Sequence, residues 1–230
     1  MAAGEIQELD LKGGVRYPSL KANHQRRGNA PMPLLPLEPF VFPDDLLTNP
    51  EARIQDSSLW WVLHTKPRTE KCLARHLLRH AVPFFLPLYQ RQWRTRGRAF
   101  RSYAPLFPGY VFLYGDNDAR LETLQTKLIA NCLPVPDQCQ LNEDLARVFH
   151  LIASGSTLWP EERLLPGSPV EITCGSLAGL HGKVVKKGKR LKFFVEVHLL
   201  QRAVSVEVED WMIRPLSESR SALTAGAEGE

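Results

Sequence analysis

Residues 106–112 read Leu106-Phe107-Pro108-Gly109-Tyr110-Val111-Phe112. Aromatic and β-branched side chains that follow a Pro-Gly pair predict a buried strand entered through a tight bend. A similar run, Leu59-Trp60-Trp61-Val62-Leu63-His64-Thr65, occurs earlier in the chain and predicts a second buried strand. Core packing is one role for these rings, and a surface that binds a partner is the alternative.

Helical periodicity appears around these strands. Apolar residues recur at helical spacing after Pro67, which suits the first position of a helix. We further expect a strand over 82–89, an Arg-rich hairpin over 90–103, a helix capped by Asp116 or Asn117, a strand over 132–135, and a helix from Asn142 that ends at Gly155. This order predicts an α+β sandwich, with helices packed on a mostly antiparallel sheet.

The hydrophobic period changes to two after residue 167. Apolar and polar residues alternate in three short segments between 170 and 208, which predicts a small all-β barrel. Gly175, Gly179 and Gly182 are expected to permit a positive-φ turn between two of its strands. Their spacing from Lys183 does not fit a phosphate-binding loop of nucleotide hydrolases.

The chain is therefore expected to have five regions. They are a disordered Pro-rich leader (1–57), an α+β domain (58–155), a linker (156–166), the barrel (167–216) and a disordered tail (217–230). Closely spaced prolines exclude a helix from the leader and favour an extended backbone. Docking of its apolar part on the following domain or on a partner is the alternative to disorder.

Positive charge is concentrated in the first half of the α+β region. Residues 59–115 contain ten Lys and Arg and one acid, a net charge of +9, within a chain whose total is +4; the remainder therefore carries −5. A segregated basic segment predicts an anionic partner, and nucleic acid is the first candidate.

Several classes of function are excluded by composition and spacing. The four cysteines lack the spacing of a zinc site, and no apolar run is long enough to span a membrane. Neither paired carboxylates nor a nucleophile motif indicates catalysis. We expect a monomeric cytoplasmic binding protein with no cofactor and no metal; an enzyme with its site in the leader is a remote alternative.

The two aromatic strands, the intervening helix and the Pro-Gly motif together resemble the N-terminal (NGN) domain of NusG transcription factors. The segment from Gly175 to Val184, with Pro166-Gly167 before it and the strand from Arg202 after it, resembles a KOW barrel. The resemblance spans residues 59–216. It implies an elongation, antitermination or termination factor that increases the processivity of RNA polymerase.

The resemblance also implies sites. A pocket on the first domain of NusG-like proteins binds the clamp helices of the largest RNA polymerase subunit. The matching positions here are Phe107, Tyr110, Phe112, Trp61 and His64. For Trp61 and Phe112, core packing is an equal alternative.

Nucleic-acid contacts, with DNA of the transcription bubble as the implied partner, are expected from basic residues of the first helix and the hairpin. These are Lys66, Arg75, His76, Arg79, Arg94, Arg96, Arg98 and Arg101. Trp93 and Phe100 lie among the hairpin arginines, which suits stacking on an unpaired base. Lys66 and His76 resemble RfaH-type paralogues, whose corresponding helix meets exposed DNA bases. A solvated charged face is the alternative.

The barrel carries its own basic cluster. Lys183, Lys186, Lys187 and Arg190 form the expected partner surface, where a KOW domain would recruit a ribosomal protein or a termination factor. A solubilising sheet edge is the alternative for these residues. A ribosome-associated RNA-binding protein is the alternative function, and the choice between a general factor and a specialised paralogue stays open.

Overall fold

The computed structural model describes residues 39–49, 57–95, 98–163, 165–187 and 190–216, of which the side chains of residues 98, 99 and 187 are not described. All of these residues fall within one unit, Pro31–Glu230. The predictions made for residues 1–38 and for the tail from 217 lie outside the described residues.

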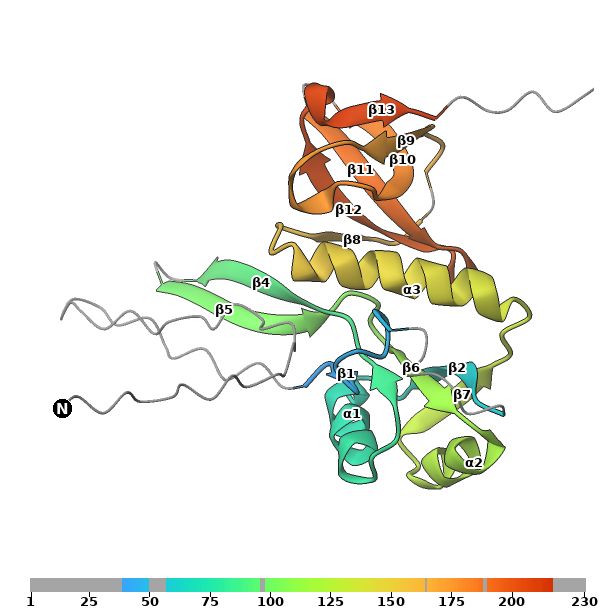
Figure 1. The fold of residues 1–230 in the computed structure, drawn as a ribbon. Helices are drawn as coiled ribbons and strands as arrows, with labels where there is room; N and C mark the ends of the chain where they lie inside the picture. The colour runs from blue at the N-terminus through green and yellow to red at the C-terminus, as the bar shows by residue number, and fades with distance from the viewer. Residues whose placement is uncertain (1–38, 50–56, 96–97, 164, 188–189, 217–230) are drawn as a thin grey trace, which may run out of the picture. The chain divides into compact units, whose positions relative to one another are not determined.

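A five-stranded antiparallel sheet forms the centre of the α+β domain (Figure 1). Its order is β1 (Val41–Phe42), β3 (Phe84–Phe85), β6 (Tyr110–Gly115), β2 (Leu59–Thr65) and β7 (Ile129–Leu133). Helices α1 (Glu70–Arg79) and α2 (Asn117–Gln125) cover one face of this sheet, and α3 (Gln138–Ala153) covers the other. The predicted α+β sandwich with a mostly antiparallel sheet is confirmed.

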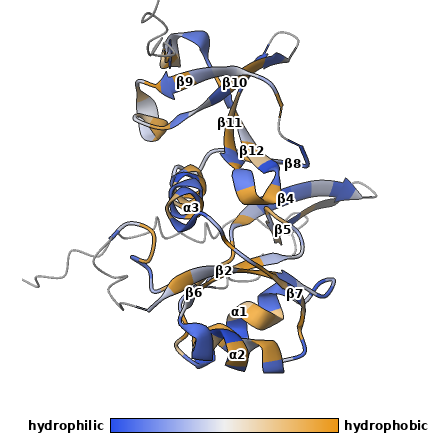
Figure 2. Ribbon diagram, turned by 90° about the vertical axis from the view of Figure 1, so that its right-hand side faces the viewer, coloured by the Kyte–Doolittle hydropathy of each residue, from blue (hydrophilic) through white to orange (hydrophobic). Residues whose placement is uncertain are grey.

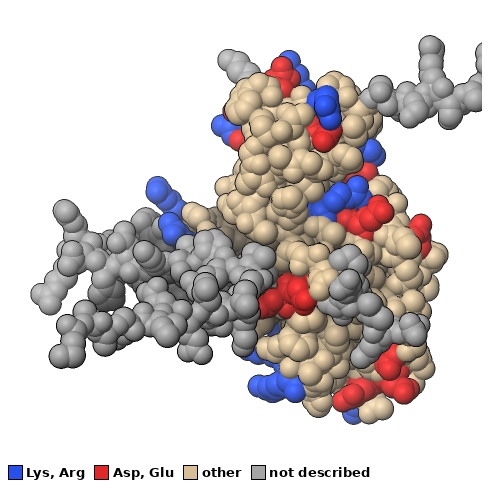
Figure 3. Space-filling model, in the orientation of Figure 1, with Lys and Arg blue, Asp and Glu red and all other residues tan. Residues whose placement is uncertain are grey.

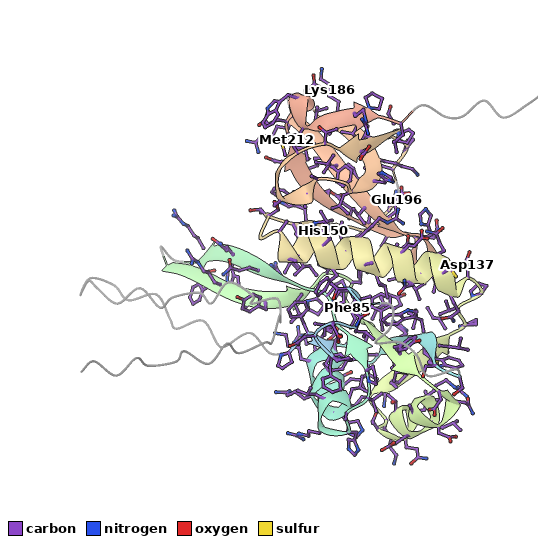
Figure 4. The ribbon with its side chains drawn as sticks, in the orientation of Figure 1. Phe85, Asp137, His150, Lys186, Glu196 and Met212 are labelled. Atoms are coloured by element: carbon purple, nitrogen blue, oxygen red, sulfur yellow. The ribbon has the colours of Figure 1, made fainter. Side chains whose placement is uncertain are left out.

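Alternation along β2 and β6 decides which side chain meets which helix. Trp60 faces α3, because its indole N–H donates to Asn142 Oδ1 at 3.3 Å. Trp61, one residue later, faces α2, where the Arg120 guanidinium lies 4.8 Å from its ring centroid. Phe85 lies between the sheet and α3 and contacts Phe149, with the ring centroids 6.1 Å apart (Figure 4).

Two helix starts differ from their predictions. Pro67 does not begin α1, because Arg68 has a left-handed φ of 64° and the helix starts only after Thr69. Helix α3 begins four residues before the predicted Asn142, since the carboxylate of Asp137 accepts a hydrogen bond from the backbone N–H of Gln140 and caps the helix there. The predicted cap of α2 is confirmed at Asp116.

Strand boundaries also shift. The strand expected over 82–89 is divided into β3 and the start of β4 (Leu88–Thr95), and Pro87, which has no N–H for a sheet, lies between them. The predicted hairpin is confirmed: β4 pairs with β5 (Arg98–Pro105) as a separate two-stranded sheet. Gly155 follows the end of α3 with a φ of 70°, as its predicted role as helix terminator requires.

Part of the predicted disordered leader belongs to the α+β domain. Phe40, Val41, Leu46 and Leu47 are buried in its core, and β1 pairs with β3 at the edge of the sheet. The prediction of disorder is therefore wrong for residues 39–49. Their apolar side chains are buried against the α+β domain, which is the docking that was given above as the alternative to disorder.

The second half of the chain forms an antiparallel six-stranded β-domain, called the barrel below. Its order is β13 (Ile213–Pro215), β9 (Ser168–Ile172), β10 (His181–Lys187), β11 (Arg190–Val197), β12 (Arg202–Val208) and β8 (Trp159–Glu161). Three short 3-10 helices connect these strands: η2 (Gly175–Leu177), η3 (His198–Leu200) and η4 (Asp210–Met212). The expected small β-domain is confirmed, and η3 separates β11 from β12.

Strand β8 lies in the segment predicted to be a linker. It pairs with β12, and Glu161 accepts hydrogen bonds from Ser205 Oγ at 2.7 Å and Lys192 Nζ at 3.2 Å. Lys192 also lies 5.0 Å from the ring centroid of Trp159. The stretch between α3 and the barrel sheet is therefore limited to residues 154–158.

Helix α3 buries residues on two sides. Leu145 and Phe149 belong to the core beneath it, while Asp144 and Leu151 are also fully buried. Figure 2 shows α3 nearly end-on, with hydrophobic and hydrophilic residues around its circumference. Strand β11 of the barrel contacts α3, and this contact accounts for the second buried side.

Candidate nucleic-acid and partner interfaces

The Pro-Gly bend before β6 is fixed by hydrogen bonds from two elements. Gly109 has a φ of 86°, a conformation that glycine adopts without steric cost. Its N–H donates to Glu70 Oε1 at 2.8 Å, and its carbonyl accepts from the N–H of Thr65 at 2.8 Å. Glu70, the first residue of α1, thus positions the bend.

Two residues predicted to bind the polymerase are core residues instead. Phe107 is 1% exposed and Phe112 is 0% exposed, and their rings meet edge-on with the centroids 6.2 Å apart. Phe112 also contacts Phe85 on the face of the sheet that α3 covers. Their assignment to a binding surface is wrong in this structure, because both rings pack in the hydrophobic core of the domain, which for Phe112 was the stated alternative.

His64 and Tyr110 form the part of the predicted site that reaches the surface. They pair across β2 and β6, and their rings lie 5.1 Å apart. His64 is exposed and Tyr110 is half-buried. Trp61 does not join them: it lies on the opposite face of the sheet, where its indole N–H donates to the carbonyl of Gly115 at 3.0 Å.

A barrel residue completes the surroundings of Tyr110. The guanidinium carbon of Arg202, the first residue of β12, lies 5.4 Å from the centroid of the Tyr110 ring. Such a distance is typical of a cation–π contact. No local sequence signal links these two residues, which come from different domains.

Basic residues of α1 line a groove. The groove has a volume of about 350 Å³ and is lined by Cys72, Arg75, His76, Arg79, Thr126 and Leu128. The backbone N–H of Lys66 donates to the carbonyl of Leu128 at 2.8 Å, which places Lys66 beside this groove. The structure thus brings together the four residues in and just before α1 that were predicted to contact nucleic acid, namely Lys66, Arg75, His76 and Arg79. Thr126 and Leu128 were missed, since the sequence does not show that they face α1.

Burial is the main cause that lowers the pKa of His76. The neighbouring His80 and Arg79 lower this pKa further, while Glu122 opposes them. The rings of His76 and His80 lie 4.3 Å apart, and His80 Nδ1 is 3.2 Å from Glu122 Oε1. At neutral pH we therefore expect an uncharged His76, which offers one donor and one acceptor within a basic groove.

Different side chains occupy the two faces of hairpin β4–β5. Trp93 and Phe100 are cross-strand partners with stacked rings, 5.6 Å between centroids, and Trp93 is 41% exposed. Arg91 shares their face by alternation, whereas Arg94 and Arg101 belong to the other face. Arg96 lies outside the described residues, and Arg98 is placed opposite Thr95 with its side chain not described. Figure 3 shows basic side chains at the outer end of this hairpin, whose sequence contains arginines and no lysine.

Two of the four residues predicted to form the basic surface of the barrel are paired with acids. Lys183 Nζ is 2.8 Å from Glu196, and Arg190 is 2.7 Å from Glu207, whose hydrogen bond raises the pKa of Arg190. Lys186 is exposed at the end of the barrel away from α3 (Figure 4). The side chain of Lys187 is not described. The barrel surface therefore offers less free positive charge than the sequence indicated.

The three predicted turn glycines have two different roles. Gly175 and Gly179 adopt φ values of 80° and 83°, as predicted. Gly182 has no such φ and lies within β10, so its predicted turn role is wrong. A Cβ at Gly182 would clash with the carbonyl of Phe194 and lie 2.6 Å from the ring of Phe193, which makes close strand approach the reason for this glycine.

The described residues contain no group of three His, Cys, Asp or Glu side chains arranged to hold a metal ion. No helix among them is long and apolar enough to cross a membrane.

The fold and its exposed groups define a class of two-domain binding protein, in which an α+β domain with a basic groove precedes a small β-domain. Residues 58–149 match the family described as "Transcription termination factor nusG". The match places the similarity to NusG transcription factors in the α+β domain. The predicted resemblance is thereby confirmed for the first domain, while the barrel lies outside the matched residues and its KOW identity stays a prediction.

One solved structure also resembles the chain. It is described as "Crystal Structure of MjSpt4:Spt5 complex conformation B" and is 14% identical in sequence, with a TM-score of 0.24. The similarity covers 70% of this chain and 98% of that one. No curated protein matches the sequence.

Proposed function

We propose that this protein is a transcription elongation or antitermination factor that binds RNA polymerase and unpaired nucleic acid near the transcription bubble. The observation that carries the proposal is the α1 groove, lined by Arg75, His76 and Arg79, within a domain that matches the NusG family. The protein would act by binding free energy alone, as a monomer in the cytoplasm.

The lining of the groove suits a single-stranded nucleotide. Arg75 and Arg79 lie one helical turn apart and supply positive charge for phosphates. An uncharged His76 and the hydroxyl of Thr126 supply hydrogen-bonding groups, and Leu128 supplies an apolar wall. A base that is already unpaired fits this combination, because its edge and its face are both accessible.

The hairpin supports the same proposal from a second place in the domain. The stacked Trp93–Phe100 pair presents an exposed ring, and base stacking on such rings tolerates any sequence. Arg94 and Arg101 on the other face are exposed and available for phosphate contacts.

For the polymerase contact we propose the surface around His64 and Tyr110. The clamp helices of the largest subunit would pack on these two rings, since aromatic side chains dominate the energy of protein interfaces. Phe107 and Phe112 would support the surface from below rather than contact the partner. The barrel would recruit a ribosomal protein or a termination factor.

The ribosome-associated alternative is less favoured. It would need the barrel to present free cations to RNA, yet Lys183, Lys192 and Arg190 each pair with a glutamate of the barrel domain or of β8. Such internal pairing reduces the charge that phosphates can neutralise.

Binding of a fluorescent single-stranded oligonucleotide, measured by anisotropy over a series of salt concentrations, tests the groove. Replacing Arg75 and Arg79 by Ala should weaken binding at least tenfold and reduce the salt slope by about 1.4, the value for two single-strand phosphate contacts. Arg214→Ala, which removes an exposed barrel cation, is the matched control and should change neither quantity. An unchanged slope in the double variant would reject the groove as the nucleic-acid site.

A further inference from the structure

The 3-10 helix η4 carries the most exposed large apolar side chain in the described part of the chain. Trp211, the middle residue of η4, is 73% exposed, whereas the other large apolar residues described in the barrel are buried or half-buried. Its indole N–H has no hydrogen-bond partner among the described residues. The contact between the barrel and α3 leaves the ring open, so neither the barrel core nor the first domain accounts for this tryptophan.

Hydrogen bonds fix the backbone of η4 against the end of β9. The carbonyl of Met212 accepts from the backbone N–H of Thr173 at 2.8 Å and from the Thr173 hydroxyl at 3.2 Å. The N–H of Met212 donates to the carbonyl of Glu209 at 3.0 Å, and its methyl carbon would lie 3.3 Å from a Cβ placed on Gly175. Strand β13 follows η4 directly and pairs with β9. Trp211 is therefore held on a fixed backbone, and a partner would have to order little besides its two side-chain torsions.

Two carboxylates without a cation precede this tryptophan. Glu209 and Asp210 are exposed, and neither side chain has an ion pair or a hydrogen bond among the described residues. Three acids on the barrel strands, in contrast, are each paired with a lysine or an arginine: Glu171, Glu196 and Glu207. The charge beside Trp211 is therefore locally negative, in a chain whose net charge is +4.

A free aromatic ring next to free carboxylates suits a cationic side chain. The face of an indole attracts a guanidinium or an ammonium group, and carboxylate oxygens accept its N–H donors. Arginine fits better than lysine, because its planar group can stack on the ring and donate to a carboxylate at the same time. The chain itself places an arginine on an aromatic ring twice: Arg120 lies 4.8 Å from the ring centroid of Trp61, and Arg202 lies 5.4 Å from that of Tyr110.

The same charges argue against nucleic acid at this ring. A base can stack on any exposed aromatic side chain, as proposed above for Trp93. The hairpin around Trp93 carries exposed arginines, among them Arg94 and Arg101, whereas Trp211 follows two acids. Phosphates beside these acids would meet like charge, which lowers affinity. The two exposed tryptophans thus lie in opposite electrostatic surroundings and fit partners of opposite charge.

We propose that the Trp211 surface, formed by Trp211, Glu209 and Asp210, binds an arginine-containing basic segment of a partner protein. An arginine of that segment stacks on the indole ring and donates to the carboxylates. The inference rests on the proposed function, in which the barrel recruits a partner protein, and it names the chemistry of that partner and the place where it binds. This place differs from the basic surface predicted from the sequence, where Lys183 and Arg190 are already paired with glutamates.

Fluorine NMR on the full chain, labelled with 5-fluorotryptophan, tests the proposal. The chain contains five tryptophans, and the variant Trp211→Phe identifies the resonance of Trp211. The probe is a short peptide of alternating arginine and glycine. The comparisons are the same peptide with glutamate in place of arginine and a short single-stranded oligonucleotide. We expect the Trp211 resonance to shift with the arginine peptide, with saturation below about 1 mM, and to stay in place with the other two.

Fluorescence anisotropy of the labelled arginine peptide measures the effect of variants. Trp211→Ala should weaken peptide binding about two- to fivefold, the factor for an exposed cation–π contact. Glu209→Gln combined with Asp210→Asn should weaken binding and reduce its dependence on salt, because the ion pairs are lost. Trp93→Ala is the matched control for an exposed tryptophan and Glu162→Gln for an exposed acid; both should bind the peptide as the wild type does.

Three results would overturn the proposal. One is a Trp211 resonance that does not respond to the arginine peptide, or that responds equally to the glutamate peptide. Another is a Trp211 response to the oligonucleotide or to the concentration of the protein alone, which would make nucleic acid or a second copy of the chain the occupant. The third is unweakened peptide binding by Trp211→Ala, with circular dichroism showing the variant folded. None of these results bears on the oligonucleotide affinity of the Arg75 and Arg79 variants, so failure at Trp211 and failure of the α1 groove are distinguishable.

Discussion

The guanidinium of Arg202 lies over the ring of Tyr110, with 5.4 Å between its central carbon and the ring centroid. Tyr110 belongs to β6 of the α+β domain, and Arg202 begins β12 of the barrel. The most accessible aromatic pair of the proposed polymerase surface is therefore partly covered by the second domain of the same chain.

Replacing Arg202 by Ala should increase the affinity for RNA polymerase about two- to fivefold, the factor that corresponds to a partly exposed cation–π contact of about 0.5–1 kcal/mol. The measurement is a titration of labelled protein with purified polymerase. Arg214→Ala, a barrel arginine remote from Tyr110 in sequence and paired with Glu171, should leave the affinity unchanged. Equal affinity for Arg202→Ala and wild type would mean that Tyr110 is not at the binding surface.

The hydrogen bond from Gly109 to Glu70 should be important for stability. Glu70→Ala leaves the Gly109 N–H without its partner in a largely buried place, and we expect a loss of about 1–3 kcal/mol in the free energy of unfolding. Glu70→Gln should lose much less, because its amide oxygen can still accept. Urea denaturation measures the free energy of unfolding of both variants. Similar losses for Glu70→Ala and Glu70→Gln would contradict the proposal that the side-chain oxygen stabilises the bend by accepting the Gly109 hydrogen bond.

His76 should titrate below the ordinary histidine pKa of about 6.5. Its folded-state pKa lies below the unfolded value, so the folded state binds fewer protons and this residue's contribution to stability declines as pH falls below about 6.5. NMR titration of the imidazole carbons measures the pKa directly. Removing the neighbouring charge by His80→Gln should raise it, and Glu122→Gln should lower it further; shifts of opposite sign would contradict the electrostatic account.

The segment before β2 should contribute to the stability of the α+β domain. Leu46 is fully buried, so Leu46→Ala should cost about 2–5 kcal/mol through lost burial and a residual cavity. Leu121→Ala, at a position that is 44% exposed, is the matched control and should cost much less. If thermal unfolding does not distinguish the two variants, the docking of residues 39–49 is not part of the stable fold.

Local patterns were sufficient to predict much of the fold. The aromatic runs predicted β2 and β6, the capping residue Asp116 predicted the start of α2, and the two-residue period predicted the barrel strands. These predictions succeeded because each depends on side chains that are neighbours in sequence. The helix starts predicted at Pro67 and Asn142 are wrong, because Arg68 adopts a left-handed φ and because Asp137 caps α3 before Asn142 is reached.

The candidate sites were predicted less completely. Alternation alone does not say that α3 covers one face of the sheet, so the sequence could not decide between a surface position and a core position for Phe112, which is fully buried. The groove residues of α1 were predicted from the positive charge of the first helix and from the family resemblance. Thr126 and Leu128, which form the opposite wall, were not predicted, because only the folded chain places the segment after α2 beside α1.

The sequence by itself determined which segments form strands and helices, where positive charge gathers, and the NusG-like order of motifs, because periodicity and capping act over a few residues. Only the tertiary structure decided which rings are exposed and which charges are free. Exposure and ion pairing depend on residues that are distant in the chain, such as Asp144 with His198 and Tyr110 with Arg202.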